Sequence, residues 1–324
     1  MPITNNASYI PTMNEFLAHW TPVDAALGTD LTVPSQHGGS MTRVEFGALR
    51  VELLARNTTV IDRLNDQEIA RGEIDLRKAA LLDRLREFTQ LVNTYWQGTG
   101  FINAVPKMPS ISDGQERFLA PLRDMISLWV KLNAAPAPGG IEVPLTLADG
   151  TPQTTASAAV AALDAAYATE AAAAQTVTIA RADREATKAL AYAVMKNYRL
   201  AVPPRCALFP ALVETLPALT PAGGHTPAPV NASAVFAPPD QAHVAYDASP
   251  DADLARYELR GNPGEHYQDD DAVVVATHAP ADAREFTTGF GLNQPGAHVA
   301  LKVYVVLTTG NEAGSAPLLV QRPV

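Results

Sequence analysis

The tripeptide Ile69-Ala70-Arg71 occurs a second time as Ile179-Ala180-Arg181, and both copies belong to a longer internal repeat. The stretch from Leu31 to Val92 aligns with the stretch from Ile141 to Val202 at a constant offset of 110 residues and without a gap. Further aligned pairs are Val33-Pro34 with Val143-Pro144, Lys78-Ala79 with Lys188-Ala189, Phe88 with Tyr198, and Val92 with Val202. The alternative is a chance similarity between two amphipathic helices. We interpret the match as a duplication, which predicts two copies of one structural unit.

Each copy is predicted to contain a short helix, a Val-Pro loop and a long helix. The first long helix is expected from about Thr42 to Trp96, because this segment contains no proline. The second is expected from about Ala156 to Ala201, where Pro203-Pro204 ends it. Apolar residues follow one face near the end of the first long helix: Leu81, Leu85, Phe88, Val92 and Tyr95.

The helical part is therefore predicted to be a helical bundle domain at residues 1–204, made of two tandem repeats at about 12–97 and 115–203. Neither copy can bury both of its faces alone, so the simplest arrangement is an internally duplicated, up-down four-helix bundle with long helices and pseudo-twofold symmetry. A Pro-rich linker with a short helix is expected at residues 205–227, since seven prolines lie between Pro203 and Pro229.

After the linker the apolar pattern changes to a period of two. This pattern, interrupted by Gly-, Asn- and Asp-rich turns, predicts a seven-stranded β-sandwich at residues 228–324. The expected strands are Val230–Phe236, Ala242–Tyr246, Leu254–Leu259, Ala272–Thr277, Arg284–Phe290, His298–Thr308 and Leu318–Gln321.

Four short motifs in this segment resemble the fibronectin type III family. They are Tyr246-Asp247-Ala248-Ser249-Pro250, Tyr257-Glu258-Leu259, Leu292-Asn293-Gln294-Pro295-Gly296 and Asn311-Glu312-Ala313-Gly314-Ser315-Ala316-Pro317. Two positions depart from the family pattern: Tyr246 stands where the family has its core Trp, and Val299 where it has a Tyr. The resemblance implies a recognition or spacer module without catalytic residues, and another immunoglobulin-like sandwich is the main alternative. For residues 1–224 we identify no family resemblance.

Composition excludes several classes of function. The net charge of −10 argues against nucleic acid as a partner, because nucleic-acid binding needs clustered Lys and Arg. A single cysteine, Cys206, excludes a disulfide framework. The N-terminus lacks the basic and apolar regions of a signal peptide, so we expect a cytoplasmic protein or one exported by a non-classical route. No apolar run approaches the roughly 18 residues that a transmembrane segment needs.

The sequence contains one candidate metal site and no candidate catalytic site. Asp269, Asp270, Asp271 and Glu265 form the densest acidic cluster and are candidate calcium ligands, because Ca²⁺ prefers several carboxylate oxygens. The alternative is a solvated loop whose charges prevent strand pairing at a sheet edge. No cofactor is predicted: the chain has no phosphate-binding loop, dinucleotide fingerprint or nucleophile elbow. No histidine lies between Gly38 and Gly224, which excludes a di-iron bundle.

Other residues have structural interpretations. Arg71 with Glu73, and Arg181 with Asp183, occupy equivalent positions in the repeat and form either a buried polar layer or solvent-exposed pairs. Cys206 is expected to be a packed apolar residue. The two tryptophans Trp20 and Trp129 are expected in the core, with an aromatic ligand clamp as the alternative.

We therefore expect a non-enzymatic structural or protein-interaction protein, in which a rigid helical spacer presents a β-sandwich recognition module. Protein partners and self-association are expected, within an oligomer or a larger bacterial or phage-like assembly. Two alternatives are a ligand- or glycan-binding receptor, which would use the sandwich loops or the bundle end, and a membrane-active bundle that inserts its Ala-rich helix.

Overall fold

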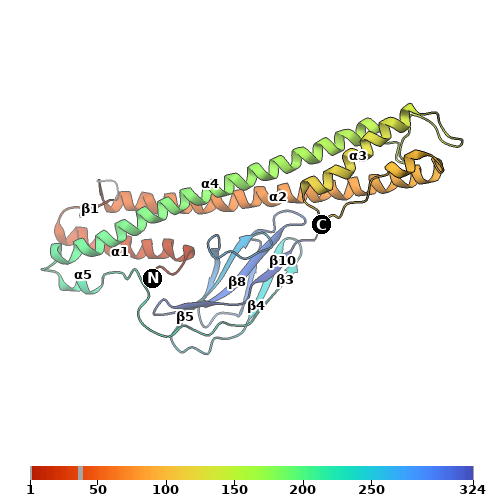
Figure 1. Cartoon of the computed structure of the whole chain (residues 1–324). Coiled ribbons are helices and arrows are strands. Elements are labelled where there is room, and N and C mark those ends of the chain that lie inside the picture. The colour runs from red at the N-terminus through yellow and green to blue at the C-terminus, as the bar shows by residue number, and fades with distance from the viewer. Residues whose placement is uncertain (1, 36–38, 324) are drawn as a thin grey trace. The chain divides into compact units, whose positions relative to one another are not determined.

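The computed structural model describes residues 2–35 and 39–323. A helical part is followed by two antiparallel β-sheets (Figure 1). The helical part contains η1 (Asn6–Ser8), α1 (Tyr9–Leu27), the short strands β1 (Val33–Pro34) and β2 (Ser40–Met41), α2 (Arg43–Tyr95), η2 (Gly100–Ala104), α3 (Gln115–Ala134), α4 (Gln153–Arg205) and α5 (Pro210–Glu214). The two long helices and the short helix after them were predicted from the sequence. None of the helices in the described ranges is long and apolar enough to cross a membrane.

Contacts divide the chain into two compact units, Met1–Glu68 with Thr176–Val324, and Ile69–Gln175. The boundary therefore crosses both long helices and does not follow the Pro-rich segment at 205–227, where the sequence suggested a domain linker. The first unit contains one end of each long helix, α1, α5 and the β-sheets. The second contains α3 and the other ends of the long helices.

Helix α2 begins with a reciprocal cap. The backbone nitrogen of Thr42 donates to a carboxylate oxygen of Glu45 at 2.7 Å, and the nitrogen of Glu45 donates to the Thr42 hydroxyl at 3.3 Å. This arrangement satisfies backbone donors that have no partner inside the helix. Helix α1 ends at Gly28, whose φ of 67° is the left-handed conformation that glycine adopts without strain.

The core of the second unit contains parts of α2, α3 and α4. The ring of Trp129 in α3 packs against Phe88 of α2, with 5.1 Å between ring centroids. The indole nitrogen of Trp129 donates to the carbonyl of Leu145 at 3.1 Å. Lys78 is buried beside this core, where its ammonium lies 5.1 Å from the ring centroid of Phe118.

The helical core of the first unit contains parts of α1, α2 and α4. Trp20 of α1 packs against Tyr198 of α4, with 4.5 Å between ring centroids, and against Phe46 of α2. Lys188 is buried nearby, and its ammonium lies 5.0 Å from the ring centroid of Tyr9. Each core thus has a tryptophan from a short helix against an aromatic ring from a long one.

In each core, segments of the two long helices pack with one of the short helices α1 and α3, so three of the four predicted bundle helices meet there. Helices α1 and α3 have 19 and 20 residues, whereas α2 and α4 have 53 each. A short helix therefore covers only part of a long one, and α1 and α3 contribute to separate cores. The four-helix cross-section is a correction to the sequence prediction.

The β-part is a sandwich of two antiparallel sheets that share one core. One sheet has the order β3-β4-β7, and the other has the order β10-β8-β5-β6 with β9 also paired to β8. The described strands are β3 (Ala232–Ala237), β4 (Gln241–Tyr246), β5 (Leu254–Pro263), β6 (Val273–His278), β7 (Glu285–Thr288), β8 (His298–Leu307), β9 (Glu312–Gly314) and β10 (Leu318–Gln321). Seven correspond to predicted strands, and β9 lies in a predicted turn.

Strand β5 is buried on both faces. Tyr257 and Leu259 enter the core between the sheets. The charged residues Glu258 and Arg260 alternate with them, and their exposure is only 2% and 1%. The outer face of this sheet is therefore covered within the first unit, although its residues are charged.

Candidate functional site

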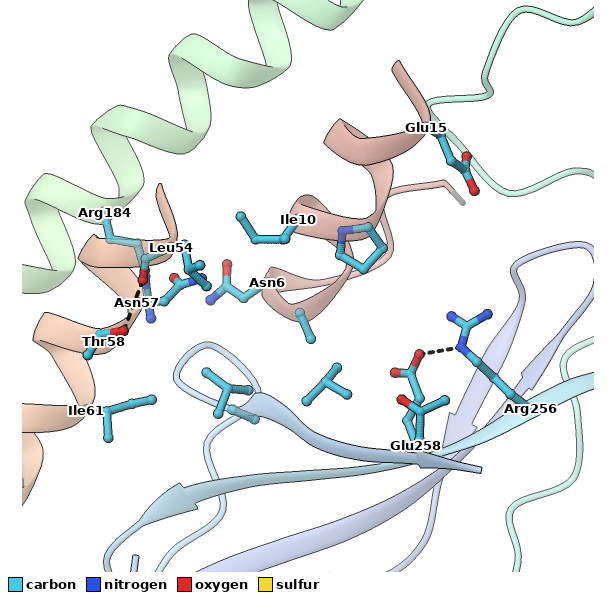
Figure 2. A pocket seen from close by; sticks show the side chains of 16 residues that line it. Asn6, Ile10, Glu15, Leu54, Asn57, Thr58, Ile61, Arg184, Arg256 and Glu258 are labelled. Carbon is cyan, nitrogen blue, oxygen red and sulfur yellow. Dashed lines mark hydrogen bonds and ion pairs between the residues drawn. The ribbon is translucent and has the colours of Figure 1, made fainter. Parts of the chain in front are cut away.

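A cavity of about 570 Å³ lies in the first unit between α1, α2, α4 and strands β5 and β6 (Figure 2). Its apolar wall includes Ile10 from α1, Leu54 and Ile61 from α2, and Val273 and Val274 from β6. Leu54 is 48% exposed, so this wall is open to solvent at α2.

Two charged residues of the cavity lining pair with each other. Figure 2 shows Arg256 beside Glu258, and the guanidinium donates to the carboxylate at 2.7 Å. The hydroxyl of Thr58 donates to the backbone carbonyl of Leu54 at 3.2 Å, a bond within α2. The cavity thus combines an apolar wall with a paired charge.

Asp271 is the central residue of a buried ion-pair cluster beside this cavity. Its carboxylate is 1% exposed and accepts from two arginines of α4. The Arg181 guanidinium binds both carboxylate oxygens, with 3.1 Å from Nε to Oδ1, and Arg184 lies 3.3 Å from Oδ1. Arg184 is itself 4% exposed. The pairs connect α4 to the segment before β6.

Asn6 of η1 adds hydrogen bonds to this contact between α4 and the segment before β6. Its amide nitrogen donates to the backbone carbonyl of Asp270, and its amide oxygen accepts from the ammonium of Lys188. A single buried asparagine thus bridges the segment before β6 and helix α4.

A second charged cluster covers the outer face of β5. Arg260 donates to Glu258 at 2.6 Å and to Glu312 of β9 at 2.6 Å, and its guanidinium lies 4.0 Å from the ring centroid of Tyr304. Burial alone would lower the pKa of Arg260, but the hydrogen bonds and charges of Glu312 and Glu258 raise it above the usual value. Asn5, next to η1, donates to Glu312. Within the first unit, the sandwich therefore contacts the helical elements through both clusters.

The four predicted calcium ligands do not converge on one point. Asp271 faces α4, as described above. Asp269 accepts from the Tyr304 hydroxyl at 2.6 Å, and Glu265 lies 3.6 Å from His298. Asp270 contributes its backbone carbonyl to Asn6. The geometry supports neither a calcium site nor a wholly solvated loop, because the cluster disperses to separate partners and Asp271 is buried.

A different group of metal-ligand side chains meets elsewhere on the sandwich. His225, Asp251 and Asp253 each place one potential ligand atom within 4.8 Å of the others, the one such group in the described ranges. The Nε2 atom of His225 lies 2.9 Å from Asp251 and 3.8 Å from Asp253. Hydrogen bonding from His225 lowers the pKa of Asp251, and Ser249 and Ala228 add to this effect. We did not predict this group, although the Asp-x-Asp spacing at 251–253 was a signal.

The other residues that the sequence analysis named lie in the helical cores or in surface ion pairs. Cys206 is fully buried in the helical core of the first unit, and burial raises the pKa of its thiol, as expected of a packed residue. Trp20 and Trp129 are fully buried in separate cores, which excludes the ligand clamp. Arg71 pairs with Glu170 at 3.3 Å and Asp183 with Arg56 at 3.1 Å, on partly exposed surfaces.

No protein-family model matches the chain, and no curated protein matches it in sequence. Solved structures match parts of it. An Fn3-like protein from Clostridium thermocellum is 20% identical, with 31% of this chain and 97% of that chain covered and a TM-score of 0.25. Chicken CNTN1 FN1–FN3 domains are 11% identical, with 33% of each chain covered and a TM-score of 0.26. Pectate lyase PelI from Erwinia chrysanthemi is 17% identical, with 28% of each chain covered and a TM-score of 0.24. At these TM-scores we assign no function from the matches.

Proposed function

We propose that the protein is a non-enzymatic structural or protein-interaction protein that associates with a second copy of itself through an exposed apolar face of α2. The observation that carries the proposal is the row Val44, Val51 and Leu54, which are 70%, 60% and 48% exposed. Val44 and Val51 are seven residues apart, and Leu54 follows three residues later, so all three share one face of the helix.

The position of this row favours a helix as its partner. Leu54 lines the cavity described above. Ile61, seven residues further along α2, lines it as well. A seven-residue apolar repeat is the pattern with which helices pack against one another. In the second unit the spacing recurs at Ile69 and Leu76, which are 59% and 67% exposed. A second copy presents the same row, which suits a twofold interface.

We also infer that the two helical copies derive from a duplication. Equivalent positions make equivalent contacts: Trp129 packs on Phe88 and Trp20 on Tyr198. The buried lysines Lys78 and Lys188 likewise lie over rings of the short helices, Phe118 and Tyr9. These rings are 109 residues apart, as Trp20 and Trp129 are, so the short helices align with a shift of one residue from the offset of 110. These pairs support common ancestry more strongly than sequence identity does. A duplicated helical scaffold that carries a docked sandwich is consistent with a place in a larger bacterial or phage-like assembly.

The self-association proposal predicts that Val51→Glu weakens oligomer formation. A carboxylate in the centre of the apolar row would lose its water on association, so we expect the dissociation constant to rise at least tenfold, or about 1.4 kcal/mol. Light scattering coupled to size-exclusion chromatography, over a range of protein concentrations, measures this change.

Ala186→Glu is the matched control, because Ala186 is exposed on α4, a different helix of the same unit. It adds the same charge and should leave association unchanged. A monomer at every concentration, or equal effects of the two substitutions, would contradict self-association through this face.

A further inference from the structure

We propose that His225, Asp251 and Asp253 form a binding site for one divalent transition-metal ion, with Zn²⁺ as the representative ion. The site joins two segments that are distant in sequence. His225 belongs to the Pro-rich segment before the sandwich, and both aspartates belong to the loop between β4 and β5. This site is independent of the proposed association through α2.

The distances between the three side chains fit one ion. Ligand atoms around a tetrahedral zinc are roughly 3.3 Å apart, given metal–ligand bonds of about 2.0–2.2 Å. Here Nε2 of His225 lies 2.9 Å from Oδ1 of Asp251 and 3.8 Å from Oδ1 of Asp253. All three potential ligand atoms lie within 4.8 Å of one another, so side-chain rotations would bring them to one centre. The side chain of His225 is 57% exposed, so its ring can make this adjustment.

The surroundings hold Asp251 in a ligating orientation. Its second carboxylate oxygen, Oδ2, accepts from the Ser249 hydroxyl at 3.0 Å and from the backbone nitrogen of Ala228 at 3.3 Å. Oδ1 is thereby directed toward His225. The backbone carbonyl of Asp253 accepts from Thr308 at 2.9 Å, which fixes the other end of the loop. Hydrogen bonds of this kind to the ligands are typical of functional metal sites.

The donor set selects the class of metal. An imidazole nitrogen with two carboxylates suits Zn²⁺ and its first-row neighbours, whereas Ca²⁺ prefers oxygen ligands only and more of them. Three protein ligands leave a coordination position for water. Since metal binding closes the contact between the Pro-rich segment and the sandwich, it should stabilise the folded chain.

Calorimetric titration of ZnCl₂ into the untagged, chelator-treated full chain tests the site. We expect one Zn²⁺ per chain, a higher unfolding temperature with Zn²⁺, and at least tenfold weaker binding by Asp251→Asn. Co²⁺ should give the visible absorption bands of a protein-bound ion, and these bands should be lost in His225→Ala. Titration with CaCl₂ should give no comparable binding.

His243→Ala is the control, because His243 is exposed on β4 of the same sandwich but lies outside the group. It should bind Zn²⁺ like the unmodified chain. The proposal is overturned if the full chain shows no saturable Zn²⁺ binding, which would leave the group as an ion pair only. It is also overturned if Asp251→Asn and His225→Ala bind Zn²⁺ unchanged, since the ion would then lie elsewhere.

Discussion

His19 is the buried residue on which several helical elements of the first unit converge. Its Nε2 lies 2.8 Å from the backbone carbonyl of Leu212 in α5, and its Nδ1 lies 2.8 Å from the Tyr198 hydroxyl in α4. A carbonyl only accepts, so Nε2 carries a proton, and in the neutral imidazole Nδ1 then accepts from Tyr198. Burial raises the pKa of Tyr198, which keeps its hydroxyl protonated and able to donate.

Replacement His19→Ala should therefore destabilise the protein. It leaves the Tyr198 hydroxyl and the Leu212 carbonyl without this partner, at a cost of about 1–3 kcal/mol in the free energy of unfolding. Urea unfolding followed by circular dichroism measures the loss. The exposed His243→Ala should change stability by less than about 0.5 kcal/mol. Equal values for the two variants would contradict the buried role of His19.

Tyr246 gives the sandwich a predictable response to alkaline pH. Burial, with smaller contributions from Tyr257 and Asp282, raises its pKa from 10.0 to about 12. A group whose pKa is raised by folding contributes its full stabilisation below its unfolded pKa and loses it as the pH rises through the folded value. Stability should therefore fall between about pH 10 and pH 12.

The variant Tyr246→Phe separates this contribution from that of other groups. Without the ionisable hydroxyl, the free energy of unfolding should decrease less steeply over this pH range than in the unmodified chain. The pKa of Tyr304 is also raised to about 12, so part of the pH dependence of stability remains in both proteins. Parallel curves for the two proteins would show that Tyr246 does not contribute.

At the scale of elements, the sequence predicted helices and strands well where backbone chemistry decides them. The absence of proline between residues 42 and 96 was enough to predict α2, and period-two patterns located seven of the strands. It missed β9, because Glu312-Ala313-Gly314 lies among turn-forming residues and becomes a strand only by pairing with β8. It also predicted one four-helix bundle, because periodicity identifies the apolar face of a helix but not which part of a long helix a short helix packs against.

The candidate sites were harder to predict than the elements. Alternation along β5 identifies Arg256, Glu258 and Arg260 as one polar face, but it does not reveal that another polar surface covers this face. The Asp269-Asp270-Asp271 run was visible as a cluster. Its dispersal depends on Arg181 and Arg184, about 90 residues away in the chain. Contacts of this kind arise from tertiary structure alone.

At the scale of the molecule, the central claim is that the sandwich is held on the helical elements of the first unit by buried charges. The ion pairs of Asp271 with Arg181 and Arg184 cross this contact, and so do the hydrogen bonds of Asn6. Asn5 also donates to Glu312, which belongs to the charged cluster inside the sandwich. Removing one partner of a buried pair leaves the other uncompensated, which costs far more than the pair contributes. The helical elements and the sandwich of this unit should therefore unfold together.

A double-mutant cycle of Arg184→Leu and Asp271→Asn tests this claim most directly. The free energy of unfolding is measured for the unmodified chain, for both single variants and for the double variant. Because the two side chains are in contact, the effects should be non-additive, with a coupling of about 1–3 kcal/mol. Additivity within about 0.5 kcal/mol would contradict the contact, and the sandwich would then be a tethered module.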